Sequence, residues 1–219
     1  AEIIRDSELP YGVVNIVTGA GETGASLVRH PDVDKIAFTG STAVGKFIRK
    51  SIAGTSKKLT LELGGKGANI IFEDAALDQA VEGIVNAIFF NQGHVCCAGS
   101  RLFVQESVAD LVISKLKIRL NSLYVGDPLD KNTDIGAINS KKQLETIRKY
   151  IEIGKSEGGQ IYQSECTLPK KGNWCPPTLF LEVSQSHRIV QEEIFGPVLT
   201  VQTFRTIDEV IEKANNSPY

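Results

Sequence analysis

The feature that most constrains the fold is a repeated order of short apolar strand, glycine-containing turn and amphipathic helix. Residues 13–17 form a β-branched run between glycines, and a helical stretch follows at 25–30. The order recurs with a strand at 35–38 and a helix at 43–52, which Ser41 is placed to cap. Since strands that alternate with helices pair in parallel beneath those helices, the sequence predicts an α/β fold.

A glycine-rich stretch at residues 62–67 (Glu-Leu-Gly-Gly-Lys-Gly) interrupts this alternation after a third strand at 59–61. We therefore predict two domains, residues 1–64 and 65–219. We also expect the first domain to begin with the end of a helix, at residues 1–7. In the second domain the alternation resumes, with strands at 69–72, 101–105, 160–162 and 198–204 and helices at 77–90, 107–123, 140–154 and 207–215.

Composition and net charge exclude several classes of protein. The 219 residues are 42% hydrophobic and 23% charged, which is typical of a globular chain with a substantial core. A formal charge of −2 provides no bulk attraction to nucleic acid or anionic lipid, so neither partner is predicted. No apolar run reaches the roughly 20 residues of a membrane helix, and the start lacks a signal-peptide layout. We expect a cytoplasmic protein.

The four cysteines and three histidines favour free thiols over structural linkages. A chain of this length with few Cys and no export signal more often keeps its thiols free. No C-x-x-C pair occurs and the histidines are scattered, so we expect no metal site. The absence of Met and the turn-like stretch at residues 215–219 favour an interior piece of a longer protein.

Two segments could carry chemistry. Residues 40–45 (Gly-Ser-Thr-Ala-Val-Gly) follow a strand and open a helix, where backbone N–H groups can receive a phosphate. On spacing alone, a helix cap that binds no ligand is the more common interpretation of this segment. Residues 90–101 place Cys96 and Cys97 in a polar, glycine-rich loop, where a thiolate is a plausible nucleophile. Two small buried hydrophobes are the alternative.

Four motifs occur in an order that resembles the aldehyde dehydrogenase superfamily. They are residues 38–42 (Phe-Thr-Gly-Ser-Thr), 61–66 (Leu-Glu-Leu-Gly-Gly-Lys), 90–101 with its Cys pair, and 192–198 (Glu-Glu-Ile-Phe-Gly-Pro-Val). With residues 10–15 and 214–216, the resemblance covers essentially the whole chain. It implies the end of a Rossmann-type cofactor domain followed by most of an α/β catalytic domain. Residues 101–108 also resemble the family 16 branch, some members of which carry a second, degenerate domain.

The resemblance implies roles for particular residues. Glu62 matches the general base and Cys96, rather than Cys97, matches the nucleophile. His94 and Val95 occupy positions that vary in the family and often hold Gln and Cys. The residues that match cofactor contacts are Gly21, Gly40, Ser41, Val44, Leu63, Glu193 and Phe195. The implied cofactor is NAD, with NADP possible, the substrate is an aldehyde, and the parent protein is expected to be a homo-oligomer.

The implied reaction proceeds through a thiohemiacetal and a thioester on Cys96, which water activated by Glu62 hydrolyses. The alternative to this catalytic role is that Glu62 lies on a solvated loop. The family's oxyanion Asn and adenosine-contacting Lys lie upstream of Ala1, so we expect the isolated chain to be inactive. The rival hypothesis is an aldehyde dehydrogenase-like scaffold that acts through protein contacts. Retention of Cys96 with Glu62 favours the enzyme, and Glu62 disfavours an acylating dehydrogenase or thioesterase.

Overall fold

The computed structural model describes residues 2–219, which form two compact units. The first unit ends at Leu63 and the second begins at Gly64, so the break lies inside the glycine-rich stretch. Each unit has its own sheet, one of two strands and one of five. No helix among residues 2–219 combines the length and the apolar character that a bilayer span requires.

The first unit is a small parallel α/β arrangement. Its elements are α1 (Glu2–Arg5), α2 (Gly21–Arg29), β1 (Lys35–Thr39), α3 (Thr42–Ser51) and β2 (Lys58–Glu62). Strands β1 and β2 pair in parallel, with Thr39 opposite Glu62 at their carboxyl ends. A core of Val28, Ile48 and Ile52 packs the two longer helices on the sheet. The predicted strand–turn–helix order of residues 35–62 is thus correct.

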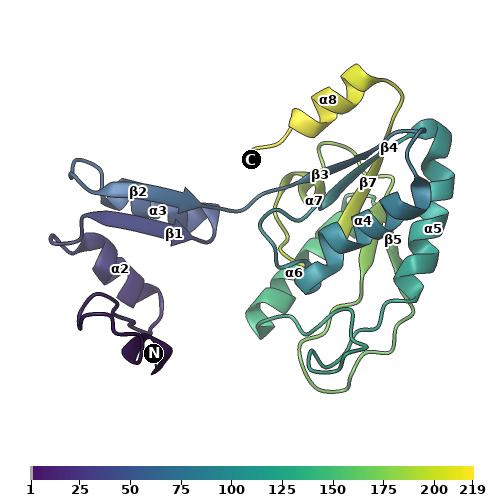
Figure 1. Ribbon diagram of the computed structural model, residues 1–219. Helices are drawn as coiled ribbons and strands as arrows, with labels where there is room; N and C mark the ends of the chain where they lie inside the picture. The colour runs from purple at the N-terminus through teal and green to yellow at the C-terminus, as the bar shows by residue number, and fades with distance from the viewer. Residues whose placement is uncertain (1) are drawn as a thin grey trace. The chain divides into compact units, whose positions relative to one another are not determined.

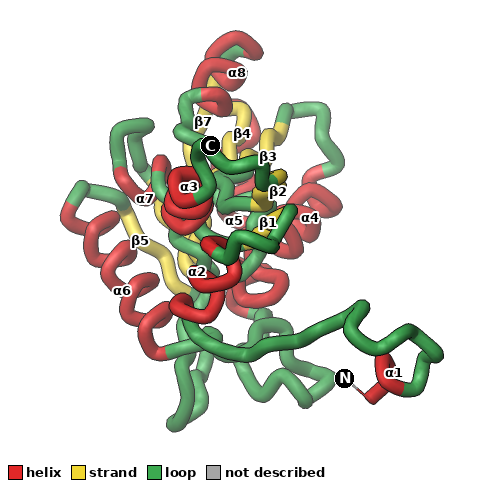
Figure 2. Tube along the Cα trace, turned by 90° about the vertical axis from the view of Figure 1, so that its left-hand side faces the viewer, coloured by secondary structure: helices red, strands yellow, loops and turns green. Residues whose placement is uncertain are grey.

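The predicted strand at residues 13–17 is wrong. The chain between α1 and α2 has no regular structure, and Figure 2 draws it as loop. Val13 and Ile16 are 61% and 65% exposed. A β-branched run has a high strand propensity, but a strand forms only when a neighbouring strand satisfies its backbone groups. Within residues 2–219 no strand pairs with this segment.

The second unit is built on a five-stranded sheet of order β3-β4-β7-β6-β5. Its strands are β3 (Ala68–Ile71), β4 (Arg101–Gln105), β5 (Gln160–Gln163), β6 (Thr178–Leu181) and β7 (Val198–Phe204). All neighbouring pairs are parallel except β5 with β6, which is antiparallel. The central strands β4, β6 and β7 are buried almost throughout, as expected for strands covered on both faces.

Helices cover both faces of this sheet (Figure 1). Helices α4 (Leu77–Phe89) and α5 (Ala109–Asn121) pack together on one face, over inward side chains such as Leu102, Leu199 and Val201. The opposite face carries α6 (Lys141–Ser156) and α7 (Arg188–Gln191), with α8 (Ile207–Asn215) over its far end. Along β7 the residues alternate between the two cores, so both apolar faces are buried.

The second unit differs from the predicted pattern in several details, and its short helix α7 was not predicted. Strand β6 was not predicted, because its four residues are all apolar or Thr, lack alternation and follow two prolines. The antiparallel pairing of β5 departs from an all-parallel sheet. The predicted helix at 107–123 begins as a 3₁₀ turn, Glu106–Val108, before α5 starts. A second 3₁₀ turn, Phe90–Gly93, follows α4.

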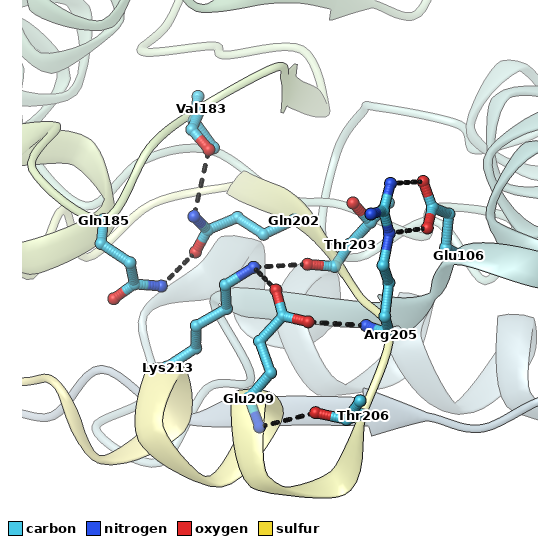
Figure 3. Close-up of polar contacts among 9 residues, drawn as sticks. All are labelled: Glu106, Val183, Gln185, Gln202, Thr203, Arg205, Thr206, Glu209 and Lys213. Carbon is cyan, nitrogen blue, oxygen red and sulfur yellow. Dashed lines mark hydrogen bonds and ion pairs between the residues drawn. The ribbon is translucent and has the colours of Figure 1, made fainter.

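Polar contacts fix α8 to the end of β7 (Figure 3). The Thr206 side chain caps the helix by accepting from the Glu209 amide. Lys213 Nζ lies 2.6 Å from the Glu209 carboxylate and donates to the Thr203 carbonyl at 2.8 Å. The guanidinium of Arg205 pairs with both oxygens of Glu106, at the end of β4. The Lys213 contact ties the last turn of α8 to β7.

Candidate active site

A tight turn presents two thiols to solvent. The Ala98 amide donates to the Val95 carbonyl at 3.1 Å, which leaves Cys96 and Cys97 at the two central positions of the turn. Both cysteines are exposed, and all four cysteines are free. The N–H groups of Cys96 and Cys97 find no acceptor within residues 2–219. The turn therefore offers exposed thiols with backbone donors beside them, and the alternative of two small buried hydrophobes does not hold for this Cys pair.

The approach to this turn is strained. Asn91 and Gln92 adopt left-handed backbone conformations, with φ of 49° and 47°, and Gly93 follows with φ of 76°. Left-handed non-glycine residues cost of order 1 to 3 kcal/mol each and cluster at functional sites. The Asn91 side chain donates to the His94 carbonyl at 3.1 Å, and the His94 amide donates to the Asn91 carbonyl at 2.9 Å. These two bonds hold the left-handed turn just before the thiols.

The glycine-rich segment lies against the cysteine turn. A Cβ added at Gly65 would lie 2.7 Å from the Cys96 carbonyl oxygen, and one at Gly67 would lie 2.7 Å from the Ala98 carbonyl oxygen. Real Cβ atoms do not approach backbone oxygens this closely, so the two segments can meet only because these positions lack side chains. The glycines of this motif thus have a packing role that sequence reasoning did not assign.

Glu193 contacts the same segment from the loop after α7. Its Oε1 accepts a hydrogen bond of 3.3 Å from the Gly65 amide. Burial raises the pKa of the Glu193 carboxyl, and the Gly65 amide and the Lys66 charge act in the opposite direction. Gln143, on α6, donates to the carbonyls of Ile194 and Phe195 at 3.0 Å each. Predicted residues Cys96 and Glu193 therefore both contact Gly65, and Phe195 lines a small cavity together with Gly65 and Glu193.

The Phe195 ring stacks on the ring of His94. The ring centroids lie 5.2 Å apart and the planes differ by 6°. Phe195 has a positive φ of 55°, and its side chain is 37% exposed. His94 is half-buried, and its Nε2 is buried without a hydrogen-bond partner within residues 2–219. The stack joins the cysteine loop to the Glu193 loop.

Beneath this site lie two buried cations, Lys66 and Arg101. Lys66 is 3% exposed, and its Nζ has no hydrogen-bond partner in the described chain. Burial first, and then the charge of Arg101, lower the pKa of Lys66 to about 7, while Glu193 and Glu192 act to raise it. Arg101 donates to the carbonyl of Lys66 at 2.9 Å and to two carbonyls near the end of α8. Both residues belong to recognised motifs, but nothing in the sequence pattern indicated their burial.

The first unit gathers most of the other predicted site residues at the carboxyl ends of β1 and β2. The Gly40 amide donates to the Glu62 carbonyl at 3.0 Å, and Glu62 is exposed. Ser41 caps α3 by accepting from the Val44 amide at 3.4 Å. Leu63 packs so closely on α3 that a Cβ at Gly45 would meet its side chain at 2.6 Å.

Gly21, the remaining predicted residue, starts α2. A Cβ added there would meet no other atom within 4 Å. Among residues 2–219 no three His, Cys, Asp or Glu side chains cluster in a way that could hold a metal ion.

Comparison with known sequences supports this picture. The profile of the Aldehyde dehydrogenase family matches residues 1–219. The chain is 46% identical over 222 residues to human "Aldehyde dehydrogenase, mitochondrial", and 46% identical over 220 residues to an aldehyde dehydrogenase of Alternaria alternata. Each alignment covers 100% of this chain but only 43% and 44% of the relative. The chain thus spans less than half the length of these curated relatives.

Solved structures give the same result for the fold. An NAD⁺ complex of aldehyde dehydrogenase from Bacillus cereus matches with a TM-score of 0.96 and 45% identity, covering 100% of this chain and 45% of that one. An NAD-dependent aldehyde dehydrogenase from Sinorhizobium meliloti matches with a TM-score of 0.96 and 41% identity, covering 99% and 44%. The predicted aldehyde dehydrogenase-like α/β fold is confirmed. The chain belongs to the aldehyde dehydrogenase family.

Proposed function

We propose that the protein containing this chain oxidises an aldehyde to a carboxylic acid, with NAD as hydride acceptor and NADP as the alternative. The observation that carries the proposal is the exposed thiol of Cys96, which lies in a turn with unpaired backbone donors, against a glycine segment that Glu193 also contacts. Relatives described as NAD-dependent or solved with NAD⁺ support the choice of cofactor.

The residues present fit a dinucleotide. The first turn of α3 follows Gly40 and Ser41 and presents backbone N–H groups, which suit a pyrophosphate. Gly21 and Val44 would line the adenosine side, and Leu63 would be a further cofactor contact. The half-buried Glu193 carboxylate, which is an acceptor when ionised, suits ribose hydroxyls, and the exposed edge of Phe195 suits a flat ring. When bound, NAD supplies an acceptor for the hydride that leaves the substrate carbon.

Cys96 begins the chemistry as a thiolate that attacks the aldehyde carbon. The tetrahedral oxyanion would be held by the free N–H groups at the turn. Loss of hydride from that carbon leaves a thioester on the sulfur. Glu62 takes a proton from a water molecule, which attacks the thioester and releases the carboxylic acid and the thiol. Removal of either group therefore blocks a different half of the reaction.

The proposal extends to the organisation of the longer protein. Residues 1–64 would contribute to cofactor binding and residues 65–219 would form the thiol-bearing catalytic part of a cytoplasmic homo-oligomer. Because the chain spans less than half of its relatives, we expect the isolated 219-residue piece to have little or no turnover. The scaffold hypothesis is not favoured, since the family match extends over the whole chain and includes Cys96 and Glu62.

The experiment compares two adjacent thiols in the full-length protein. Aldehyde-dependent NADH formation should fall on the order of 10⁴-fold or more in Cys96→Ala and stay within a few-fold of wild type in Cys97→Ala. Cys97 shares the turn and the exposure of Cys96, so it controls for loss of a thiol as such. Unchanged turnover in Cys96→Ala would overturn the enzymatic proposal in favour of the scaffold.

A further inference from the structure

We infer that His94, in its neutral form, is a positioning residue that fixes the Phe195 ring at the cofactor site. The inference rests on the proposed function, since it concerns where the nicotinamide would lie. Its evidence is geometric. The two rings are nearly parallel, at 6°, with centroids 5.2 Å apart, and they come from loops about 100 positions apart in the chain.

Phe195 needs support because its own backbone does not provide a relaxed conformation. Its φ of 55° lies in the left-handed region, which a bulky side chain rarely adopts. Gln143 donates hydrogen bonds to the backbone carbonyls of Ile194 and Phe195, but these bonds do not constrain the Phe195 ring. The flat face of His94 supplies that constraint, and aromatic stacking of this kind contributes beyond simple burial.

The neutral form of His94 fits this position better than the cation. Burial lowers its pKa, and no charged neighbour contributes to the shift. Nε2 is buried with no acceptor in the described residues, so a proton there would leave an unpaired, charged donor. The titratable groups on the adjoining segments are Cys96 and Cys97 on the same loop, and Glu192 and Glu193 on the facing one.

As a consequence, the residue at position 94 on the thiol loop would influence the position of the nicotinamide, because it holds the Phe195 ring. His94 lies two residues before Cys96. Gln is a polar replacement that keeps a hydrogen-bonding side chain but cannot stack as a ring. Phe is the matched replacement that keeps a flat aromatic face but cannot take up a proton.

The test measures dissociation constants of the full-length protein for NAD⁺ and for ADP, which lacks the nicotinamide ribose and ring. In His94→Gln and His94→Ala, we expect the Kd for NAD⁺ to rise about two- to tenfold at pH 8, with the Kd for ADP unchanged. His94→Phe should restore wild-type affinity for NAD⁺. Equal losses for NAD⁺ and ADP, or no loss in either variant, would overturn the inference.

A pH series tests whether His94 acts in its neutral form. Because burial lowers the pKa of His94 from 6.5, His94 stays mainly neutral between pH 8 and pH 6.5, and the NAD⁺ affinities of wild type and His94→Phe should change in parallel over this range. His30→Asn, which keeps an acceptor for the Asp32 amide, should follow the wild-type curve. A loss of NAD⁺ affinity over this range in the wild type that is absent in His94→Phe would overturn the inference. Failure of the wild type to bind NAD⁺ at all would instead overturn the proposed function.

Discussion

The backbone amide of Gly65 donates a 3.3 Å hydrogen bond to Oε1 of Glu193, although the two residues are 128 positions apart in the sequence. The bond joins the glycine-rich segment that begins the second unit to the loop after α7. On its other side the same segment touches the cysteine turn at the Cys96 carbonyl. One short stretch of backbone thus sets the separation between the thiol and the carboxylate.

Substitution of Gly65 tests this close contact. In Gly65→Ala the new Cβ would lie 2.7 Å from the Cys96 carbonyl oxygen, so one of the two backbones must move. We expect turnover of the full-length protein to fall at least about tenfold, with a loss of roughly 1 to 3 kcal/mol in the free energy of unfolding.

Gly83 is the matched control for that substitution. It lies within α4, and a Cβ there would meet nothing within 4 Å. Gly83→Ala should therefore leave turnover unchanged and stabilise the protein by roughly 0.5 to 1 kcal/mol. Chemical denaturation and steady-state rates measure both effects. Equal behaviour of the two alanine variants would show that the contact between Gly65 and Cys96 is unimportant.

Lys66→Met should stabilise the protein, and the gain should depend on pH. In the unfolded chain Lys66 holds its proton up to about pH 10.5, but in the folded protein only up to about pH 7. Between these values the unfolded state binds more protons, so the wild type becomes more stable as pH rises. Met removes the buried charge, and we expect a gain of roughly 2 to 5 kcal/mol at pH 6 that shrinks toward pH 10.

Urea denaturation at pH 6, 8 and 9.5 measures that trend. Lys131→Met, at an exposed position, provides the control, and its difference from wild type should not vary in this way. A pH-independent difference for Lys66→Met would mean that Lys66 does not carry a displaced pKa in the folded protein.

Arg101→Met should destabilise the protein strongly. The Arg101 guanidinium is buried and donates to three carbonyls, those of Lys66, Lys213 and Ala214. Loss of these charge-assisted bonds leaves carbonyl groups unsatisfied, at a cost of roughly 2 to 4 kcal/mol. Arg205→Met removes an exposed guanidinium that pairs with Glu106, and its effect on the unfolding free energy should be much smaller. Similar melting temperatures for the two variants would contradict this account of Arg101.

The sequence predicted those parts of the fold whose signal is local. Strands β1 and β4 and helix α6 each show an apolar pattern or a cap, and Ser140 does cap α6 as an N-terminal serine should. Residues 13–17 have an equally clear strand pattern but form a loop, because strand formation depends on a partner elsewhere in space. Strand β6 was missed for the opposite reason. It is buried on both faces, so it lacks alternation.

The features of the candidate site also divide into those that the sequence predicted and those that it did not. Motif resemblance predicted Cys96, Glu193 and Phe195 as site residues, and the structure places Cys96 and Glu193 against Gly65, with Phe195 lining a cavity that Gly65 and Glu193 share. The burial of Lys66 and the stack between His94 and Phe195 could not be predicted, because they arise from contacts between loops distant in sequence. The left-handed turn before the thiols is likewise set by those contacts and not by turn-forming residues alone.

The most direct test of the central claim is to trap the acyl group on Cys96 in the full-length Glu62→Gln protein. With aldehyde and NAD⁺, this variant should release one NADH per site in a rapid burst. Peptide mass spectrometry should then show Cys96 carrying the aldehyde's mass less two hydrogens, and a Cys97→Ala background makes the assignment unambiguous. The adduct should be absent in Cys96→Ala. An acyl group on Cys97, or steady wild-type turnover with no adduct on Cys96, would contradict the proposed roles of both Cys96 and Glu62.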